Sequence, residues 1–356
     1  MGSSTKNVLC FAKGSVAYLG AVHSDLSNPE DFVKFEKEVK YFLKSNPKII
    51  AYDLHPEYGS TKYALKLPEG RYRLLAIQHH HAHIASCMAD NGLGNQRVIG
   101  VAFDGTGLGA DNTIWGAEFL VCDYKNFQRK AHLKEIPLLG GERAIIEPAR
   151  TAAAWLYSIY KNNFLNLKID FVKGIDKKKW QILKNMYASG LNSPLASSAG
   201  RLFDAVASLV LVKYQAKLEA ELAMELEKIA MAANPQATGY NFRLIRKSSH
   251  AYIIDPALMF KEIVSALKHK EAQEKISYRF HLTVAEIIKK TCLTLRKADK
   301  INKVVLSGGV FQNNLLLRLG SDLLRKEGFE VFTHKELSCN DSGISLGQAI
   351  IANSRS

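Results

Sequence analysis

The chain has 356 residues, 47% of them hydrophobic and 23% charged, and a formal net charge of +14. This composition is typical of a globular protein with a sizeable core and excludes a disordered chain. No apolar run is long enough to cross a bilayer, and the first residues lack the apolar core of a signal peptide. The five cysteines form no Cys-x-x-Cys pair, which excludes a cysteine-rich zinc finger and favours a cytoplasmic protein. The lysines are dispersed and form no basic stripe with aromatics, so nucleic acid is not the expected partner.

The first quarter of the chain has the pattern of an α/β unit. Apolar runs and turn residues predict strands, and apolar positions at helical spacing predict helices. The expected elements are a hairpin over 7–25, a helix over 29–45, a strand over 48–56, a helix over 60–67 and a strand over 72–78. Ser60 or Thr61 is the expected cap of the second helix.

The same opening recurs later in the chain. Residues 97–123 again predict strand, glycine turn and strand, and residues 301–336 predict strand, glycine loop, helix and strand. Residues 148–295 are mostly helical in pattern, and the clearest helix is expected over 211–233, which is rich in alanine, leucine and charge. The recurrence of hairpins and βα units predicts a duplicated α/β architecture.

Four of the eleven histidines fall in "QHHHAHIAS", which spans residues 78–86. On a helix, His79 and His83 share one face with Cβ atoms roughly 5–6 Å apart, which suits two ligands of one metal ion. Good helix formers follow as far as Gly92, a plausible stop. The alternative is a pair of surface or core histidines satisfied by hydrogen bonds, and the pattern alone does not decide between the two.

Two aspartates are candidates for the remaining ligands of such a site. Asp104 ends an apolar strand, and Asp341 lies between a predicted strand and a helix. Carboxylates beside two imidazoles suit iron, zinc or manganese. Taken singly, each aspartate is more typical of a turn or a helix cap.

Three glycine-containing segments lie beside predicted strands or helices. They are "DGTGLG" from Asp104, "SSAGRLFDAVASLV" over 197–210 and "LSGGVFQNN" over 306–314. Glycine permits close backbone approach and a helix N-terminus favours an anion, so these loops are candidates for a nucleotide site. None is a Walker A loop, and glycine turns after strands are common. Asp204 suits a ribose hydroxyl but is equally an ordinary acid early in a helix.

Six segments, in order, resemble the C-terminal carbamoyltransferase region of the HypF family of [NiFe]-hydrogenase maturation proteins. They are "AYDLHPEYGSTKYA", "QHHHAHIAS", "VAFDGTGLGADNTIWGAEF", "SSAGRLFDAVASLV", "LSGGVFQNN" and "CNDSGISLGQA". The resemblance covers residues 6–354, and the superfamily includes the tRNA threonylcarbamoyl transferases. It implies duplicated RNase H-like halves of the actin/Hsp70/sugar-kinase type. The expected lobes are residues 1–95 and 96–356, with a helical insertion at about 148–295 in the second.

The resemblance also implies a reaction. In the family, carbamoyl phosphate and ATP give carbamoyl-adenylate on a YrdC-like domain. The C-terminal region then passes the carbamoyl group to the C-terminal cysteine thiolate of HypE, on the way to the cyanide ligands of the [NiFe] centre. One divalent metal, iron or zinc, is implied at the transfer site.

The resemblance assigns site residues as follows. The metal ligands, which are also the expected catalytic residues, are His79, His83, Asp104 and Asp341. The residues expected at the nucleotide are Gly105, Thr106 and Gly107 at its carbamoyl-phosphate end, Gly200 and Asp204 along it, and Gly308, Gly309 and Asn313 in the second loop. His55 matches a family motif, and a structural strand-end role for it is equally compatible.

The chain departs from the full family pattern. It has no acylphosphatase-like, zinc-finger or YrdC-like segment, so we expect the adenylate to be supplied by a YrdC-like domain in cis or in trans. The chain is then expected to be either an excised half or a separately encoded subunit. Three other functions stay open: threonylcarbamoyl transfer to tRNA, O-carbamoylation of a small molecule, and an actin-like ATPase or sugar kinase. The tRNA family usually has His-x-Glu-Gly-His, whereas residues 80–82 here are His-His-Ala.

Overall fold

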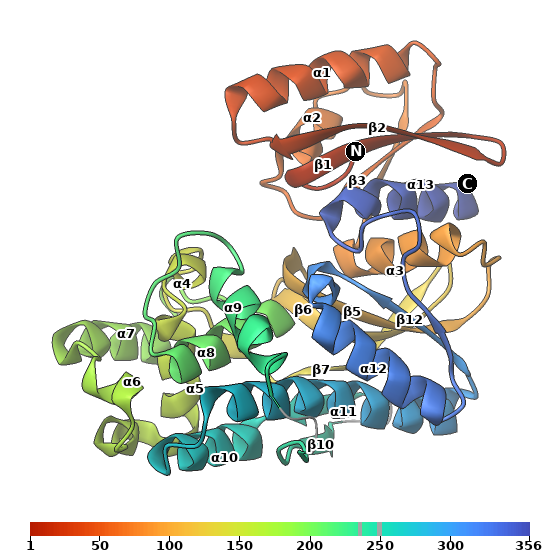
Figure 1. Cartoon of the computed structure of the whole chain (residues 1–356). Helices are drawn as coiled ribbons and strands as arrows, with labels where there is room; N and C mark the ends of the chain where they lie inside the picture. The colour runs from red at the N-terminus through yellow and green to blue at the C-terminus, as the bar shows by residue number, and fades with distance from the viewer. Residues whose placement is uncertain (234–236, 248–250) are drawn as a thin grey trace.

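The computed structural model describes residues 1–233, 237–247 and 251–356, and the expected mixed α/β fold is confirmed (Figure 1). The first part of the chain forms a small body drawn at the top of Figure 1. Its elements are β1 (Thr5–Lys13), β2 (Val16–Asp25), α1 (Pro29–Leu43), β3 (Ile49–Asp53), α2 (Gly59–Leu65) and β4 (Arg73–Ile77). The next helix, α3 (His79–Asp90), lies below this body and packs on the large sheet that follows. β1 and β2 are antiparallel, whereas β3 and β4 are parallel and form a separate sheet.

A large sheet organises the rest of the chain, in the order β10-β11-β7-β6-β5-β12-β13. β5, β6 and β7 form an antiparallel meander, and β12 and β13 extend it as parallel strands beside β5. The strands are β5 (Val98–Leu108), β6 (Ile114–Cys122), β7 (Phe127–Leu133), β8 (Ile136–Pro137), β9 (Leu195–Ser198), β10 (Arg243–Arg246), β11 (Tyr252–Asp255), β12 (Lys303–Ser307) and β13 (Glu330–Phe332).

Helices fill most of the segment expected to be helical and cover the sheet. They are α4 (Arg143–Ile146), α5 (Ala149–Tyr160), η1 (Lys161–Asn166), α6 (Asp170–Lys173), α7 (Lys177–Ser189), α8 (Ala199–Leu211), α9 (Glu221–Ala230), α10 (Ala257–Lys268) and α11 (Gln273–Asp299). After β12 come η2 (Gly309–Gln312), α12 (Asn314–Lys326), η3 (Asp341–Gly343) and α13 (Ile344–Ser354). Residues 234–236 and 248–250 of the expected insertion lie outside the described residues. In the part of the chain that the structure describes, no helix has both the length and the apolar character to cross a membrane.

The C-terminal helix α13 returns to the first body. It contacts α3 along its length and also touches β1 and β3, so both chain ends lie near one another (Figure 1). Gly347 permits this approach, because a Cβ there would overlap the carbonyl of Ala82 on α3. The lobe boundary at residues 95 and 96 stays a prediction.

Two local expectations are wrong. The helix expected over 211–233 is interrupted: α8 ends before Val212, which has a left-handed backbone, and α9 begins only at Glu221. A tertiary hydrogen bond holds the intervening segment: the hydroxyl of Tyr214 donates to the carbonyl of Phe171.

The predicted cap of α2 is the second error. The N-cap residue is Tyr58, and the helix begins at Gly59. Ser60 Oγ donates to the carbonyl of Ser3, and Thr61 Oγ1 donates to the carbonyl of Asp53. The two hydroxyls therefore tie α2 to its neighbours instead of capping it.

Candidate metal centre

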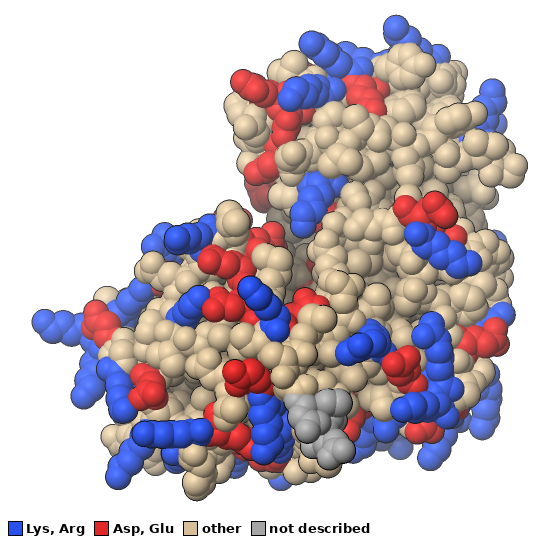
Figure 2. Space-filling model, in the orientation of Figure 1, with Lys and Arg blue, Asp and Glu red and all other residues tan. Residues whose placement is uncertain are grey.

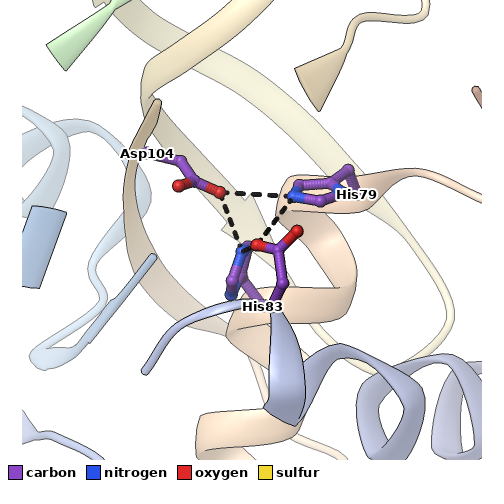
Figure 3. A group of neighbouring side chains, drawn as sticks. His79, His83 and Asp104 are labelled. Atoms are coloured by element: carbon purple, nitrogen blue, oxygen red, sulfur yellow. Dashed lines mark hydrogen bonds and ion pairs between the residues drawn. The ribbon is translucent and has the colours of Figure 1, made fainter. Parts of the chain in front are cut away.

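The histidine cluster forms the first turns of α3, as predicted. Gln78 caps this helix, and its side chain accepts a hydrogen bond from the backbone N–H of His81. The helix ends at Asp90 and is followed by Gly92, whose φ of 65° is suited to glycine. His79 and His83 lie one turn apart with ring centroids separated by 5.0 Å, and both rings are fully buried (Figure 3).

The four predicted ligands converge in the structure. Nε2 of His79 and Nε2 of His83 lie 3.2 Å and 3.0 Å from Oδ2 of Asp104 (Figure 3). The same two nitrogens lie 3.7 Å and 3.6 Å from Oδ1 of Asp341. One ligand atom from each of the four residues lies within 4.8 Å of all the others. Two imidazole nitrogens and two carboxylate oxygens facing one point are a suitable donor set for iron or zinc.

The elements that bring these residues together are far apart in sequence. His79 and His83 come from α3, Asp104 from β5, and Asp341 from η3 at the start of α13. The pairing of β5 with β6 is irregular between Phe103 and Gly107, where Asp104 lies. Oδ1 of Asp104 accepts hydrogen bonds from the N–H groups of Gly105 and Gly309, at 2.8 Å and 3.2 Å. These two bonds hold the carboxylate so that its other oxygen faces the histidines.

The charges of the site favour protonated forms of His79 and His83 and an ionised Asp104. Burial alone would lower the pKa of His79, but the carboxylates of Asp53, Asp341 and Asp104 raise it well above its usual range. Burial also opposes the charge on His83, whose pKa is raised by hydrogen bonds to Asp104 and Asp341. The pKa of Asp104 is held well below its usual range by the two histidines, despite its burial. A divalent cation at this point would replace the histidine protons as the counter-charge.

The outer nitrogens of both histidines have partners that the sequence reasoning missed. Nδ1 of His79 lies 2.8 Å from Oδ2 of Asp53, which is fully buried at the end of β3. Behind His83, the Oγ of Ser307 on β12 lies 3.5 Å from Nδ1 of His83. The same hydroxyl lies 2.9 Å from Nε2 of His334. Carboxylate and hydroxyl contacts of this kind fix the orientation of metal-binding imidazoles.

The motif around Asp53 contained the missed signal. The sequence "DLHP" drew attention to His55, whereas the structure directs Asp53 to the metal centre. The ring of His55 stacks on that of Tyr58 with centroids 4.3 Å apart. The backbone N–H of His55 donates a hydrogen bond to Oδ1 of Asp53. Burial raises the pKa of the Tyr58 hydroxyl well above its usual range, and the carboxylates of Asp53 and Asp341 add to the shift. Tyr58 therefore shares the anionic surroundings of the centre.

The other two histidines of the cluster lie outside the ligand set. His81 contacts the carbonyl of Asp123 at 2.6 Å. Nδ1 of His80 lies 3.1 Å from Nε2 of Gln78, and its ring lies beside Trp115. Both rings are buried structural groups.

The glycines expected at the nucleotide lie around the same centre. Gly200, at the start of α8, packs directly against Gly105, because a Cβ at Gly200 would lie 2.8 Å from the Cα of Gly105. Gly308 has a φ of 106°, and a Cβ there would overlap the carbonyl oxygen of Phe103. A Cβ at Gly107 would lie 2.6 Å from Cε1 of His80, so this glycine makes room for the histidine cluster. Thr106 lies on β5 between Gly105 and Gly107 and is half-buried.

Asp204 and Asn313 both have partners within the protein. On α8, Nη2 of Arg201 lies 2.9 Å from Oδ2 of the buried Asp204. Asn313 caps α12 by accepting from the N–H of Leu316, and its amide nitrogen lies 3.0 Å from Nε2 of His281. A nucleotide contact at either residue would have to compete with these bonds, and both assignments stay predictions.

Comparison with known proteins places the chain in a family. The model described as "Carbamoyltransferase, Kae1-like Domain, second subdomain" matches residues 100–348, and the model "HypF Kae1-like domain" matches residues 1–90. Carbamoyltransferase HypF of Rhodobacter capsulatus is 33% identical over 99% of this chain and 46% of its own length. A "Carbamoyltransferase HypF homolog" of Cupriavidus necator is 31% identical, over 99% of this chain and 90% of its own.

A solved structure extends this similarity to the fold. The crystal structure of full-length HypF in the phosphate- and nucleotide-bound form has a TM-score of 0.92 and 40% identity, over 99% of this chain and 54% of that one. This chain thus spans about half the length of most of the curated relatives it matches. A tRNA N6-adenosine threonylcarbamoyltransferase of Syntrophotalea carbinolica matches only 44% of the chain, at 26% identity. The chain belongs to the HypF carbamoyltransferase family, and it corresponds to the Kae1-like domain of the family's longer members.

Proposed function

We propose that this chain transfers a carbamoyl group from carbamoyl-adenylate to the C-terminal cysteine thiolate of HypE, during assembly of the cyanide ligands of [NiFe] hydrogenase. The observation that carries the proposal is the convergence of His79, His83, Asp104 and Asp341 on one point within 4.8 Å. Membership of the HypF family supports carbamoyl transfer as the chemistry. The adenylate comes from a YrdC-like domain that uses carbamoyl phosphate and ATP.

The four convergent residues would hold one iron or zinc ion. When bound, the ion supplies Lewis acidity and a template for the phosphate and carbamoyl oxygens of the donor. The backbone bonds to Asp104 and the contact between Asp53 and His79 keep the ligands in place before the donor arrives. Preorganisation of this kind avoids reorganisation during the reaction.

The chain's own backbone suits the anionic end of the donor. Ser198 caps α8, and its Oγ accepts the N–H of Arg201 and donates to the carbonyl of Gly105. The N-terminus of α8 is thereby fixed against the loop that follows Asp104, where its helix dipole favours a phosphate. Gly105 and Gly200 keep this junction free of side chains.

In the transfer step the cysteine thiolate of HypE attacks the carbamoyl carbon. A carbon–sulfur bond forms, the carbon–oxygen bond to the phosphate breaks, and AMP leaves with the electron pair. The nucleophile comes from the partner, so none of the chain's cysteines is needed. Burial raises the pKa of the Cys339 thiol to about 11, which keeps this neighbour of Asp341 protonated and unreactive at neutral pH.

Transfer to tRNA is the nearest competing function. The net charge of +14 would favour it. On the face drawn in Figure 2, however, Lys and Arg alternate with Asp and Glu and form no continuous basic track. Small-molecule carbamoylation and sugar-stimulated ATP turnover are further outcomes that the assay below separates from the proposal.

The test is mass spectrometry of HypE after incubation with this chain, a YrdC-like domain, carbamoyl phosphate and ATP. We expect a carbamoyl adduct on the C-terminal cysteine that requires the chain and is lost in His79→Ala and Asp341→Ala. Matched controls are His269→Ala and Asp322→Ala, which change exposed residues on other elements and should leave the adduct intact. No adduct, with the adenylate shown to be present, would refute HypE as acceptor. The same mixture with tRNA, a small-molecule hydroxyl or a sugar then identifies the alternative.

A further inference from the structure

The backbone on both sides of His334 is fastened to the end of α3. The side-chain amide of Asn91 donates a hydrogen bond to the carbonyl of Thr333, at 2.8 Å. The carboxylate of Asp90 accepts three more, from consecutive backbone N–H groups at 2.7 Å, 3.2 Å and 3.3 Å. These groups belong to Lys335, Glu336 and Leu337. His334 is thereby held against the helix that carries the two histidines of the metal centre, although it lies more than 240 residues further along the chain.

The ring of His334 links the same carboxylate to the metal centre. Its Nδ1 lies 3.3 Å from Oδ2 of Asp90, and both side chains are at most 5% exposed. On the other side of the ring, Nε2 lies 2.9 Å from Oγ of Ser307. That hydroxyl lies 3.5 Å from Nδ1 of His83, whose Nε2 faces Asp104 at the centre (Figure 3). One continuous line of contacts, which we call the Asp90 relay, therefore runs from Asp90 through His334 and Ser307 to His83.

A line of aspartate, histidine and serine also occurs in hydrolases, where the serine is the nucleophile. That role does not suit Ser307, because its side chain is fully buried and its hydroxyl contacts the face of His83 that points away from the centre. A substrate at the centre could reach Ser307 only by displacing a candidate metal ligand. The arrangement therefore acts on the imidazole of His83.

The chemistry of its members gives the Asp90 relay a direction. Burial alone would raise the pKa of the Asp90 carboxyl, but its three backbone donors lower it below its usual range, so this group only accepts. Burial lowers the pKa of His334 to about 4, so its ring carries a single N–H at neutral pH. An acceptor beside Nδ1 keeps that hydrogen on Nδ1 and leaves Nε2 to accept the O–H of Ser307. The oxygen of Ser307 can then accept the Nδ1–H of His83, which leaves the Nε2 lone pair of His83 for a cation.

We propose that Asp90 and His334 are positioning residues of the metal centre, and that the Asp90 relay holds His83 in the tautomer whose Nε2 binds the cation. The proposal rests on the metal site of the proposed function and is independent of the carbamoyl donor and acceptor. Histidine ligands of metals usually direct their second N–H to a fixed acceptor, most often one tied to a carboxylate or the backbone. Asp53 serves His79 in this way by direct contact, and the Asp90 relay serves His83 over a longer path.

The first test reads the tautomer of His334 in the unmodified full chain loaded with Zn²⁺. Nitrogen-15 NMR distinguishes an imidazole protonated at Nδ1 from one protonated at Nε2, and the ring signals are assigned through bonds from the backbone of His334. We expect the Nδ1–H form at neutral pH. A ring protonated at Nε2, or at both nitrogens, would overturn the proposal, because it could not accept the O–H of Ser307. This test needs no variant.

The second test is a double-mutant cycle on the affinity for Zn²⁺, measured by titration calorimetry. His334→Phe keeps an aromatic ring without its nitrogens, and Ser307→Ala removes the hydroxyl. Each should lower the affinity about tenfold. Because both act on His83 through one path, the double variant should also lose only about tenfold. Independent effects would multiply to a loss of about a hundredfold, and that result would overturn the relay.

The control and the remaining outcomes separate the relay from the metal centre itself. His269→Phe changes an exposed histidine at the end of α10 and should bind Zn²⁺ as the unmodified chain does. Circular dichroism checks that each variant is folded. Unchanged affinity in both single variants would overturn the relay and leave the metal centre intact. A full chain that binds neither Zn²⁺ nor Fe²⁺ would instead refute the metal centre of the proposed function, and the relay with it.

Discussion

The carboxylate of Asp53 on β3 lies 2.8 Å from Nδ1 of His79 on α3, and both side chains are fully buried. This contact joins the first sheet to the metal centre, since Nε2 of the same imidazole faces Asp104 and Asp341. The contact fixes the ring and favours the tautomer whose Nε2 is free to bind a metal ion. Asp53 is therefore a positioning residue, outside the ligand set.

The substitution Asp53→Asn tests this role. It preserves the shape of the side chain but removes its charge, and we expect affinity for Zn²⁺ or Fe²⁺ to fall by about 10–100-fold. Titration calorimetry of the full chain measures the affinity directly, and circular dichroism checks that the fold is retained. Asp322→Asn, on the exposed side of α12, is the matched control and should bind as the unmodified chain does. Unchanged metal affinity in Asp53→Asn would contradict the assignment.

Gly107 should prove necessary for the arrangement of the histidines. A Cβ at this position would lie 2.6 Å from Cε1 of His80, closer than real Cβ atoms come to any neighbour, and 3.0 Å from Cδ2 of His79, which is tighter than most real Cβ contacts. Gly107→Ala should therefore displace the His79 ring and weaken metal binding by tenfold or more, since a tenfold loss corresponds to only about 1.4 kcal/mol. Calorimetric titration is again the measurement. Gly94→Ala is the control, because no atom lies within 4 Å of a Cβ there. If the two variants bind metal equally well, the steric argument is wrong.

The centre itself was largely predictable from sequence, because its signals are local. The i, i+4 spacing of His79 and His83 requires only that the segment be helical. Asp104 is conspicuous because it ends an apolar run in the sequence, although in the structure β5 continues past it to Leu108. Asp341, more than 230 residues further along the chain, is a candidate because it lies between a predicted strand and a helix, and the family resemblance then assigns it to the same site as the histidines.

The contacts around the ligands were not predictable in this way. Asp53 and His334 reach the centre through packing of separate strands, and a pattern read along one segment contains no such information. The broken helix over 211–233 has the same cause. Its composition favours a helix, but Tyr214 bonds to Phe171 and Ala216 bonds to Ile146, and these contacts outweigh local propensity.

Gly308 should contribute to stability through both its backbone conformation and its packing. Its φ is 106°, and a Cβ would overlap the carbonyl of Phe103 on the neighbouring strand. Gly328 also has a positive φ, 78°, but has open space around it. Replacement of Gly328 by alanine should cost about 1 kcal/mol, and replacement of Gly308 clearly more, about 3 kcal/mol or above. Urea unfolding at neutral pH measures both. Equal losses would show that the contact with Phe103 relaxes without cost.

Glu147 should make the free energy of unfolding depend on pH at values below 4.5, the ordinary pKa of a glutamate carboxyl. Its side chain is only 5% exposed and accepts hydrogen bonds from Arg143, Arg150 and Lys179. Burial alone would raise the pKa of this carboxyl, but Arg150, Lys179 and Arg143 lower it to about 2. The folded state therefore binds the proton less readily than the unfolded chain. The resulting stabilisation is complete above about pH 4.5 and is lost as the pH falls towards 2.

Glu147→Gln removes this linkage and isolates its contribution. At pH 7 we expect a loss of about 1–3 kcal/mol in the free energy of unfolding, because three cations lose a charged acceptor. Between pH 4.5 and pH 3, the unmodified chain should lose more stability than the variant, so that the difference between them narrows. Urea unfolding at pH 7, 4.5 and 3 follows the difference. Asp170→Asn, which breaks the exposed pair with Lys173, should show little change at any of these values. A difference between Glu147→Gln and the unmodified chain that stays constant down to pH 3 would rule out the ionised carboxylate as its cause.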